Sequence, residues 1–121
     1  MTKSANVAPP QSLILIADPS GGEIPATMSG LAIAATDSCI AVGCRSDVDG
    51  DSEFILGETG YVSLGGEPAF QGRLKTPHRK VTLRTVTGQK ILEAPVLQQE
   101  ITVRVWTNDS SEPDQVVVGI G

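Results

Sequence analysis

Hydrophobic and polar residues alternate along most of this chain, with a period of two rather than the 3.6 of an amphipathic helix. The clearest case is the segment 101–106, where Ile101, Val103 and Val105 share one face and Thr102 and Arg104 lie on the other. Burial of one face only is typical of antiparallel sheets. The pattern therefore predicts strands that each contribute one face to a hydrophobic core.

Nine short segments carry this alternation or a short apolar run: residues 12–17, 31–35, 40–45, 53–57, 69–75, 80–86, 89–94, 100–107 and 115–120. Turn residues separate them, as in the Asp-Pro-Ser-Gly-Gly stretch at 18–22, where proline fixes φ and glycine permits a positive φ. Many short strands without intervening helices predict an all-β fold. We expect an antiparallel β-sandwich or flattened barrel of about eight or nine strands, with little or no helix. Residues 26–32 are the least regular stretch and are compatible with a short helical turn, which Gly30 weakens.

A chain of 121 residues has the length of one domain. We expect residues 11–121 to form a single sandwich domain and residues 1–10 to form a flexible arm, because a terminal stretch with Pro9 and Pro10 buries little surface. The apolar run 13–17 is too short for the hydrophobic part of an export signal or for a membrane-spanning helix. These features predict a cytoplasmic protein that does not bind membranes.

Aromatic residues make up only 3% of the chain and hydrophobic residues 40%, so the core must be built mainly from aliphatic side chains. Cys39 and Cys44 lie five positions apart, which puts them on opposite faces of one strand. Their Cα atoms would then be about 16 Å apart, too far for a disulfide bond. We expect two buried, reduced thiols.

Charge is distributed unevenly along the sequence. The formal net charge is −5, with residues 1–67 contributing −7 and residues 68–121 contributing +2. An acidic total argues against nucleic-acid binding, which depends on neutralising phosphates. The separation of sign favours a dipolar surface that steers a charged protein partner or a second copy of this chain.

The most suggestive acidic string is Asp47-Val48-Asp49-Gly50-Asp51-Ser52-Glu53, which predicts an exposed loop between two strands. Its candidate binding residues are Asp47, Asp49, Asp51 and Glu53, which would meet a basic partner. The spacing of Asp47, Asp49, Asp51 and Glu58 also resembles a calcium loop, because a hard cation takes six to eight oxygen ligands. The sixth loop position is Ser52 rather than glycine, and the flanks read as strands instead of helices. The loop therefore favours a solvated hairpin over a metal site.

The late strands carry a second candidate interaction surface. It comprises five cations and one tryptophan, namely Arg73, Lys75, Lys80, Arg84, Arg104 and Trp106. Alternation predicts that the cations at 73 and 75 face outward and that those at 80 and 84 extend the same face. A tryptophan beside an arginine is typical of interface hot spots. The alternative is that Trp106 packs against the sandwich while the cations are simply solvated.

The sequence offers little for catalysis. His78 is the only histidine, and its neighbours Pro77, Arg79 and Lys80 predict an exposed turn. No nucleophile motif accompanies it, and the pairs Gly21-Gly22 and Gly65-Gly66 lack the partners of a phosphate-binding loop. We therefore expect no enzyme activity and no cofactor.

Four segments of the second half resemble small bacterial β-rich proteins of the competence protein J type. They are Arg79-Lys80-Val81-Thr82-Leu83, Gln89-Lys90-Ile91-Leu92-Glu93, Arg104-Val105-Trp106-Thr107 and Gln115-Val116-Val117-Val118. The resemblance covers about the last 45 residues by strand order and transfers no binding residue. It implies a β-sandwich, and it implies the role of a small acidic protein that blocks a basic nuclease.

Together these features predict a non-enzymatic acidic binding module, of immunity or inhibitor type, with a macromolecular partner. The alternative is a structural module whose copies associate through exposed sheet edges or through their acidic and basic sides. A ligand-binding barrel or a small enzyme would need a concave pocket that gathers His78 or several carboxylates.

Overall fold

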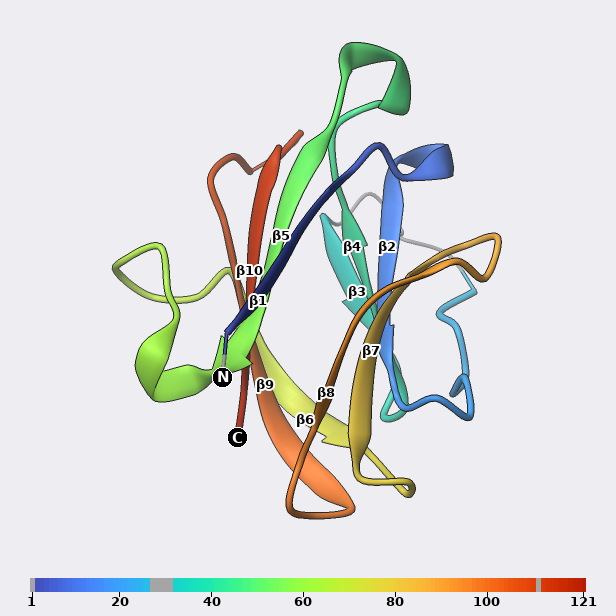
Figure 1. Cartoon of the computed structure of the whole chain (residues 1–121), viewed down its shortest axis with the longest axis vertical. Coiled ribbons are helices and arrows are strands. Elements are labelled where there is room, and N and C mark those ends of the chain that lie inside the picture. Colours follow the sequence, from blue (N-terminus) through green and yellow to red (C-terminus); the bar gives the residue numbers. More distant parts are fainter. Residues whose placement is uncertain (1, 27–31, 111) are drawn as a thin grey trace.

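The computed structural model describes residues 2–26, 32–110 and 112–121, and its architecture is an all-β sandwich of two sheets (Figure 1). The described strands are β1 (Lys3–Val7), β2 (Leu13–Ala17), β3 (Ile33–Ala35), β4 (Cys39–Gly43), β5 (Ser52–Glu58), β6 (Phe70–Lys75), β7 (Lys80–Thr85), β8 (Lys90–Pro95), β9 (Glu100–Thr107) and β10 (Gln115–Ile120). The described residues also form three single-turn 3-10 helices: η1 (Pro10–Ser12), η2 (Asp47–Asp49) and η3 (Thr59–Tyr61). The predicted sandwich with little helix is confirmed.

The two sheets have five strands each. The first sheet has the order β1-β5-β10-β9-β6, and the second has the order β3-β4-β2-β7-β8. All neighbouring pairs are antiparallel except β5 and β10, which run parallel with Phe54 opposite Val116. The purely antiparallel prediction is therefore wrong at this pair. Period-two patterning specifies which side chains are buried but not the direction of the neighbouring strand.

The main core lies between the sheets and follows the predicted alternation. On β9 the inward residues Ile101, Val103 and Val105 are buried, while Thr102 and Arg104 between them are only partly covered. Phe54 on β5 is the largest fully buried side chain. The rest of the main core is almost entirely aliphatic, as the composition predicted.

Two smaller clusters cover the outer faces of the sheets. Leu15, Ala17, Cys39 and Ala41 pack together on β2 and β4, on the face opposite the main core. Val62, Trp106 and Val117 form the other cluster on β9 and β10, with Val62 supplied by the loop that follows η3. Strands buried on both faces have near-continuous apolar runs, which explains the sequences of β2, β4 and β10.

The nine predicted strands all overlap strands of the structure, but the predicted flexible arm is wrong. Lys3–Val7 forms β1, an edge strand paired antiparallel with β5 in the register Lys3 opposite Leu56. Val7 packs against the main core, and the Lys3 ammonium donates a hydrogen bond to the Glu93 carbonyl on β8. Backbone pairing with β5 therefore holds a stretch whose own side chains bury little. The predicted helical turn at 26–32 falls mostly on residues 27–31, outside the described residues.

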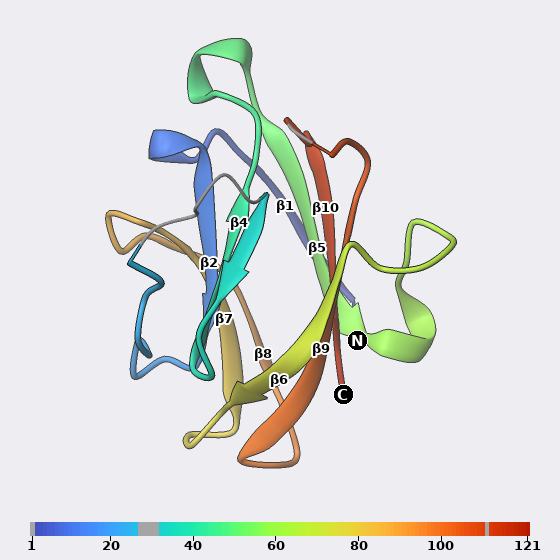
Figure 2. The same cartoon turned by 180° about the vertical axis from the view of Figure 1, so that it is seen from behind.

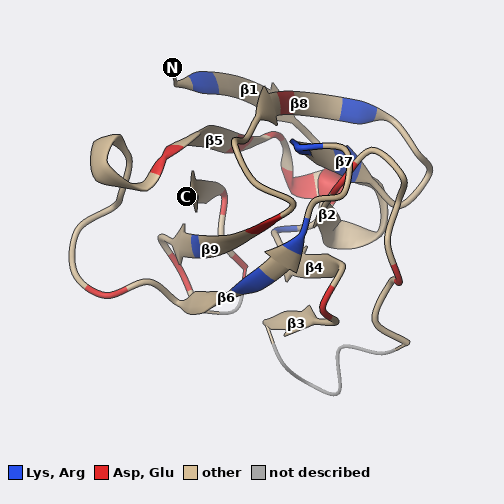
Figure 3. Ribbon diagram, turned by 90° about the horizontal axis from the view of Figure 1, so that it is seen from below, with Lys and Arg blue, Asp and Glu red and all other residues tan. Residues whose placement is uncertain are grey.

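Edge strands β1 and β8 meet on one side of the sandwich and close it, as Figure 3 shows. On the opposite side, the edges are β3 and β6, which face the viewer in Figure 2. Among the described residues, no helix is long and apolar enough to cross a membrane.

Candidate functional site

The acidic loop between β4 and β5 is an ordered projection whose tip is exposed. Its helical turn η2 begins after Ser46, whose hydroxyl accepts a hydrogen bond from the Val48 amide at 3.3 Å. The Arg45 guanidinium donates to the Asp51 carbonyl at 2.8 Å and ties the two ends of the loop together. The Val48 side chain at the tip is 87% exposed, and Asp47 and Asp49 flank it in the same exposed turn. The loop thus presents an apolar residue between carboxylates.

A second acidic loop lies beside the first at the same end of the sandwich (Figure 1). It joins β9 to β10, and its acids are Asp109, Glu112 and Asp114. The Arg45 amide donates to the Pro113 carbonyl at 3.0 Å, and the Glu53 amide donates to the Asp114 carbonyl at 2.8 Å. The Arg45 guanidinium also pairs with the Asp114 carboxylate at 3.6 Å. Both loops precede strands that run parallel, so both must lie at the end of the sheet where those strands begin.

The side chain of Asn108 organises this second loop. Its carbonyl oxygen accepts hydrogen bonds from the amides of Asp114 and Gln115, and its amide group donates to the Asp114 carboxylate at 2.6 Å. At the base of the two loops, the Gln115 amide group donates to the Glu53 carboxylate at 2.9 Å. Residues far apart in sequence are thus held in fixed relative positions.

We call this surface the acidic end. It comprises Val48 and seven acidic residues, which are half of the fourteen in the chain: Asp47, Asp49, Asp51, Glu53, Asp109, Glu112 and Asp114. Arg45 is the only Lys or Arg in residues 44–53 and 108–114, which comprise the two loops and the start of β5. Sequence reasoning found the first four acids and missed the other three. No local signal identifies them, since only the pairing of β5 with β10 brings the loops together.

The metal-site reading of the first loop is not supported by the geometry. Glu58 ends β5, whereas Asp47, Asp49 and Asp51 precede its start. A strand of seven residues spans about 20 Å, so Glu58 lies at the opposite end of the sheet. Among the described residues, no group of three or more His, Cys, Asp or Glu side chains is placed to hold a metal ion.

The predicted continuous cationic face is wrong. Arg73 and Lys75 project from β6 in the first sheet, whereas Lys80 and Arg84 lie on β7 in the second sheet. Figure 3 shows the blue segments on both sheets. The Arg84 guanidinium donates to the Gly21 carbonyl at 2.8 Å, so it fixes the loop after β2. The two strands are consecutive in sequence, but their connection crosses from one sheet to the other.

Trp106 shares the outer face of β9 with Arg104, as alternation predicted, but it is only 6% exposed. The loop after η3 covers it, and its indole N–H donates to the Gly66 carbonyl at 3.2 Å. Trp106 therefore packs against the sandwich, as the alternative prediction proposed, and is not exposed as an interface hot spot. Arg104 donates to the side-chain oxygen of Gln71 at 3.3 Å.

His78 lies in an exposed turn, as predicted, with 65% of its side chain accessible. Its amide donates to one Asp18 carboxylate oxygen at 2.8 Å, and its Nδ1 lies 2.8 Å from the other. Asp18 is almost fully buried and also accepts the Ser20 amide at 2.9 Å. Burial alone would raise the pKa of Asp18, but the hydrogen bonds from Ser20 and His78 outweigh it and lower the pKa. The pair joins the loop after β2 to the turn between β6 and β7.

Cys39 and Cys44 are free, buried and on opposite faces of the second sheet, as predicted. Burial raises the pKa of both thiols, that of Cys44 to about 12, because the thiolate is poorly solvated there.

Both thiols should therefore be inert in the folded protein and react fully after unfolding in guanidinium, as measured by titration with a chromogenic disulfide reagent. A Ser63→Cys variant, with its new thiol at an exposed position, supplies the reactive control. Fast reaction of the two native thiols in the folded wild type would contradict this prediction.

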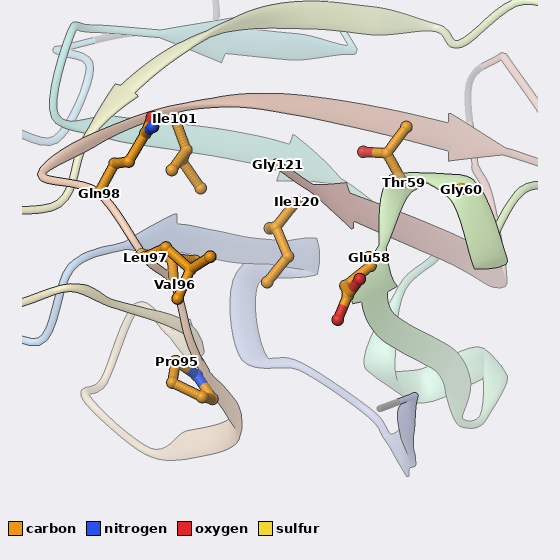
Figure 4. Close-up of a pocket in the computed structure, with 10 residues that line it drawn as sticks. All are labelled: Glu58, Thr59, Gly60, Pro95, Val96, Leu97, Gln98, Ile101, Ile120 and Gly121. Atoms are coloured by element: carbon orange, nitrogen blue, oxygen red, sulfur yellow. The ribbon is translucent and has the colours of Figure 1, made fainter.

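A pocket of about 400 Å³ opens at the end of the sandwich opposite the acidic end (Figure 4). Its walls are largely apolar, with Pro95 at the end of β8 and Val96 and Leu97 in the connection to β9 lying across from Ile120. Glu58 is the only Asp, Glu, His, Lys, Arg or Cys side chain among its lining residues. The pocket therefore does not gather the several titratable side chains that the enzyme reading requires.

In its fold, the chain is similar to small proteins built as two-sheet β-sandwiches. In particular, it is similar to the crystal structure of ComJ, an inhibitor of the DNA degrading activity of NucA from Bacillus subtilis. The TM-score is 0.68 at 8% identity, over 98% of this chain and 93% of ComJ. It is also similar to the protein described as crocagin biosynthetic gene J, with a TM-score of 0.53 at 9% identity over 99% of this chain and 97% of that one.

No protein-family model and no curated protein matches the sequence. The expected resemblance to competence protein J is confirmed for the fold across the whole chain. At these identities the likeness concerns the fold alone, since one fold serves many functions.

Proposed function

We propose that this protein is a non-catalytic binding module that inhibits or neutralises a basic protein partner, and that the acidic end is its binding surface. The observation that carries the proposal is that two acidic loops meet at one end of the sandwich and that one of them exposes the apolar side chain of Val48 at its tip. Seven carboxylates with one arginine among them create a strongly negative potential, which accelerates encounter with a cationic surface.

The construction of the two loops supports a role in binding. The side chains of Ser46 and Asn108 accept backbone hydrogen bonds, and the Arg45 guanidinium donates one, so the loops are held in one conformation before any partner arrives. Preorganised loops lose less conformational entropy on association. Val48 supplies exposed apolar surface between Asp47 and Asp49, and binding interfaces commonly combine apolar contacts with surrounding polar groups.

The structural neighbour supports the class of partner. ComJ inhibits a DNA-degrading activity, and an enzyme that degrades DNA must present cations to the phosphate backbone. An acidic surface competes for those cations by presenting carboxylates in place of phosphates. We therefore infer that the partner is a protein with a cationic nucleic-acid-binding surface.

The proposal is tested by reversing two charges at the tip with Asp49→Lys and Asp51→Lys. Both side chains are exposed, so the double variant should fold like the wild type while the equilibrium dissociation constant rises by about tenfold or more. Affinity should also depend less on salt between about 50 and 200 mM NaCl, because fewer charge pairs remain to be screened. The probe is the partner captured on the immobilised wild-type protein, identified by mass spectrometry and titrated in purified form.

The matched control is Glu23→Lys with Glu67→Lys, which changes the net charge equally at two exposed acids outside the acidic end. This control should retain wild-type affinity. Equal affinity of the wild type and the Asp49/Asp51 double variant would exclude the acidic end as the binding surface. A captured partner with no effect of the protein on its DNA degradation would exclude nuclease inhibition.

A further inference from the structure

Strand β6 has a free edge on the open side of the sandwich. It is the last strand of the first sheet, and among the described residues its one strand partner is β9. The Thr76 amide donates to the Gln99 carbonyl and continues the β6–β9 register, so residues 70, 72 and 74 direct their backbone groups toward β9. Residues 71, 73 and 75 must then direct theirs outward. The Lys75 amide does so, donating to the Asp37 carbonyl at 2.9 Å.

The outward backbone groups of Gln71 and Arg73 have no such partner. Within the described part of the chain, no group hydrogen-bonds to the N–H or C=O of either residue. The opposite side of the sandwich differs, because there the Lys3 side chain bonds to the Glu93 carbonyl of β8 and bridges the two edges. Two donors and two acceptors are therefore presented in the geometry of a strand that lacks its neighbour.

Beside this edge lies an apolar groove between β6 and β3. It has a volume of about 290 Å³ and is lined mainly by Ala32, Ile33, Ala69 and Phe70. Phe70 and Ile33 are only partly buried and pack against the main core. A strand added to β6 would place every second side chain toward this groove, since successive side chains point to opposite faces.

The side chains on the outer face of β6 determine the charge of a strand that could pair with its free edge. Gln71, Arg73 and Lys75 are exposed there, and the side chains of Arg73 and Lys75 are 61% and 57% accessible. Their ion pairs with Glu100 (2.8 Å) and Asp37 (2.9 Å) lie in solvent, where such pairs are weak and exchange readily. Antiparallel pairing of β6 with β6 of a second copy would bring cations of both copies together, and like charges directly opposite are destabilising. Acidic residues at those positions would instead be stabilised.

We propose that the β6 edge binds an extended segment of an acidic partner peptide, which adds a sixth strand to the first sheet. Its Asp or Glu residues lie opposite Gln71 and Arg73 on the outer face. Apolar residues between them point into the groove beside Phe70. Backbone hydrogen bonds supply the attachment, and the alternation of acidic and apolar residues supplies the specificity. This site is separate from the acidic end. It binds an acidic segment, whereas the acidic end binds a basic partner.

The test uses a seven-residue peptide of alternating Val and Glu, capped at both ends, and measures its binding by calorimetry. The decisive variant is Gln71→Pro, which deletes one outward N–H but leaves the ladder to β9 intact, because proline is tolerated where the N–H faces away from the sheet. The dissociation constant should rise about fivefold or more in Gln71→Pro, whereas Gln71→Ala should bind like the wild type. Thermal unfolding of both variants checks that β6 has remained folded.

Two altered peptides separate the contributions of charge and backbone. Replacing Glu with Lys should abolish binding, and methylating the backbone nitrogens of the Glu residues should do the same, since those N–H groups would face β6. Amide hydrogen exchange should be fast at Gln71 and Arg73 in the free protein and slow once the Val/Glu peptide is added. Protection that rises with protein concentration alone would show a second copy at the edge and overturn the proposal. Equal binding of the methylated peptide, or of Gln71→Pro, would also overturn it.

Discussion

Replacing Phe54 with alanine is expected to lower the free energy of unfolding by about 3–5 kcal/mol, because a large side chain is removed from a core that cannot collapse around the space. Phe54 is fully buried on β5 and pairs with Ala5 of β1 on one side and Val116 of β10 on the other. In the part of the chain that the structure describes, it is the only aromatic residue fully enclosed by the main core, where aliphatic side chains surround it. A loss of this size is a large share of the stability of a small domain.

Guanidinium-induced unfolding followed by circular dichroism measures this effect. The matched control is Tyr61→Ala, which also removes an aromatic ring, but one that is 81% exposed in η3. The control should change the free energy of unfolding by less than about 0.5 kcal/mol, as surface substitutions usually do. Similar losses for the two variants would mean that the sheets do not enclose Phe54 as described.

Replacing Asp18 with alanine should cost about 1–3 kcal/mol, because it removes the buried acceptor of the Ser20 and His78 amides, which are themselves only partly buried. The carboxylate accepts three hydrogen bonds while only 2% of its side chain is exposed, so water cannot readily replace it. Asp37→Ala, which removes an exposed carboxylate from an ion pair with Lys75, is the control and should have a much smaller effect.

The contribution of Asp18 should also depend on pH. Because its pKa is lowered in the folded protein, the carboxylate stabilises the fold fully at pH values above its ordinary pKa of 3.8. That stabilisation is lost as the pH falls from there through the lowered, folded-state pKa. The difference in unfolding free energy between the wild type and Asp18→Asn should therefore be constant from about pH 7 to 5 and shrink below about pH 4. A difference that grows on acidification would contradict the assignment.

The edge strand β1 shows where the pattern of a single segment is insufficient. Residues 3–7 contain Lys3, Ser4 and Asn6, and only Ala5 and Val7 are apolar. Such a stretch forms a strand because β5 offers it a row of backbone partners, and edge strands need only one partly buried face. The sequence of residues 3–7 alone does not show that β5 lies alongside them, so it does not predict this strand.

The two candidate binding surfaces differ in how far the sequence could predict them. The loop at Asp47–Asp51 was identified because its acids are adjacent in sequence, whereas Asp109, Glu112 and Asp114 join it only through the parallel β5–β10 pair. The cations of β6 were correctly placed on an outer face, but those of β7 lie on the other sheet. Trp106 faces outward from its strand yet is covered by a loop 40 residues away in sequence.

The sequence by itself determined nine of the ten described strands, which of their side chains face the core and where most turns lie, because these features depend on neighbours one or two positions apart. Only the tertiary structure decided which strands are adjacent, in which direction they run and which loops share an end of the sandwich. Those choices depend on backbone hydrogen bonds between distant segments, and any strand can make such bonds with many others. The acidic end and the free β6 edge both result from these tertiary contacts.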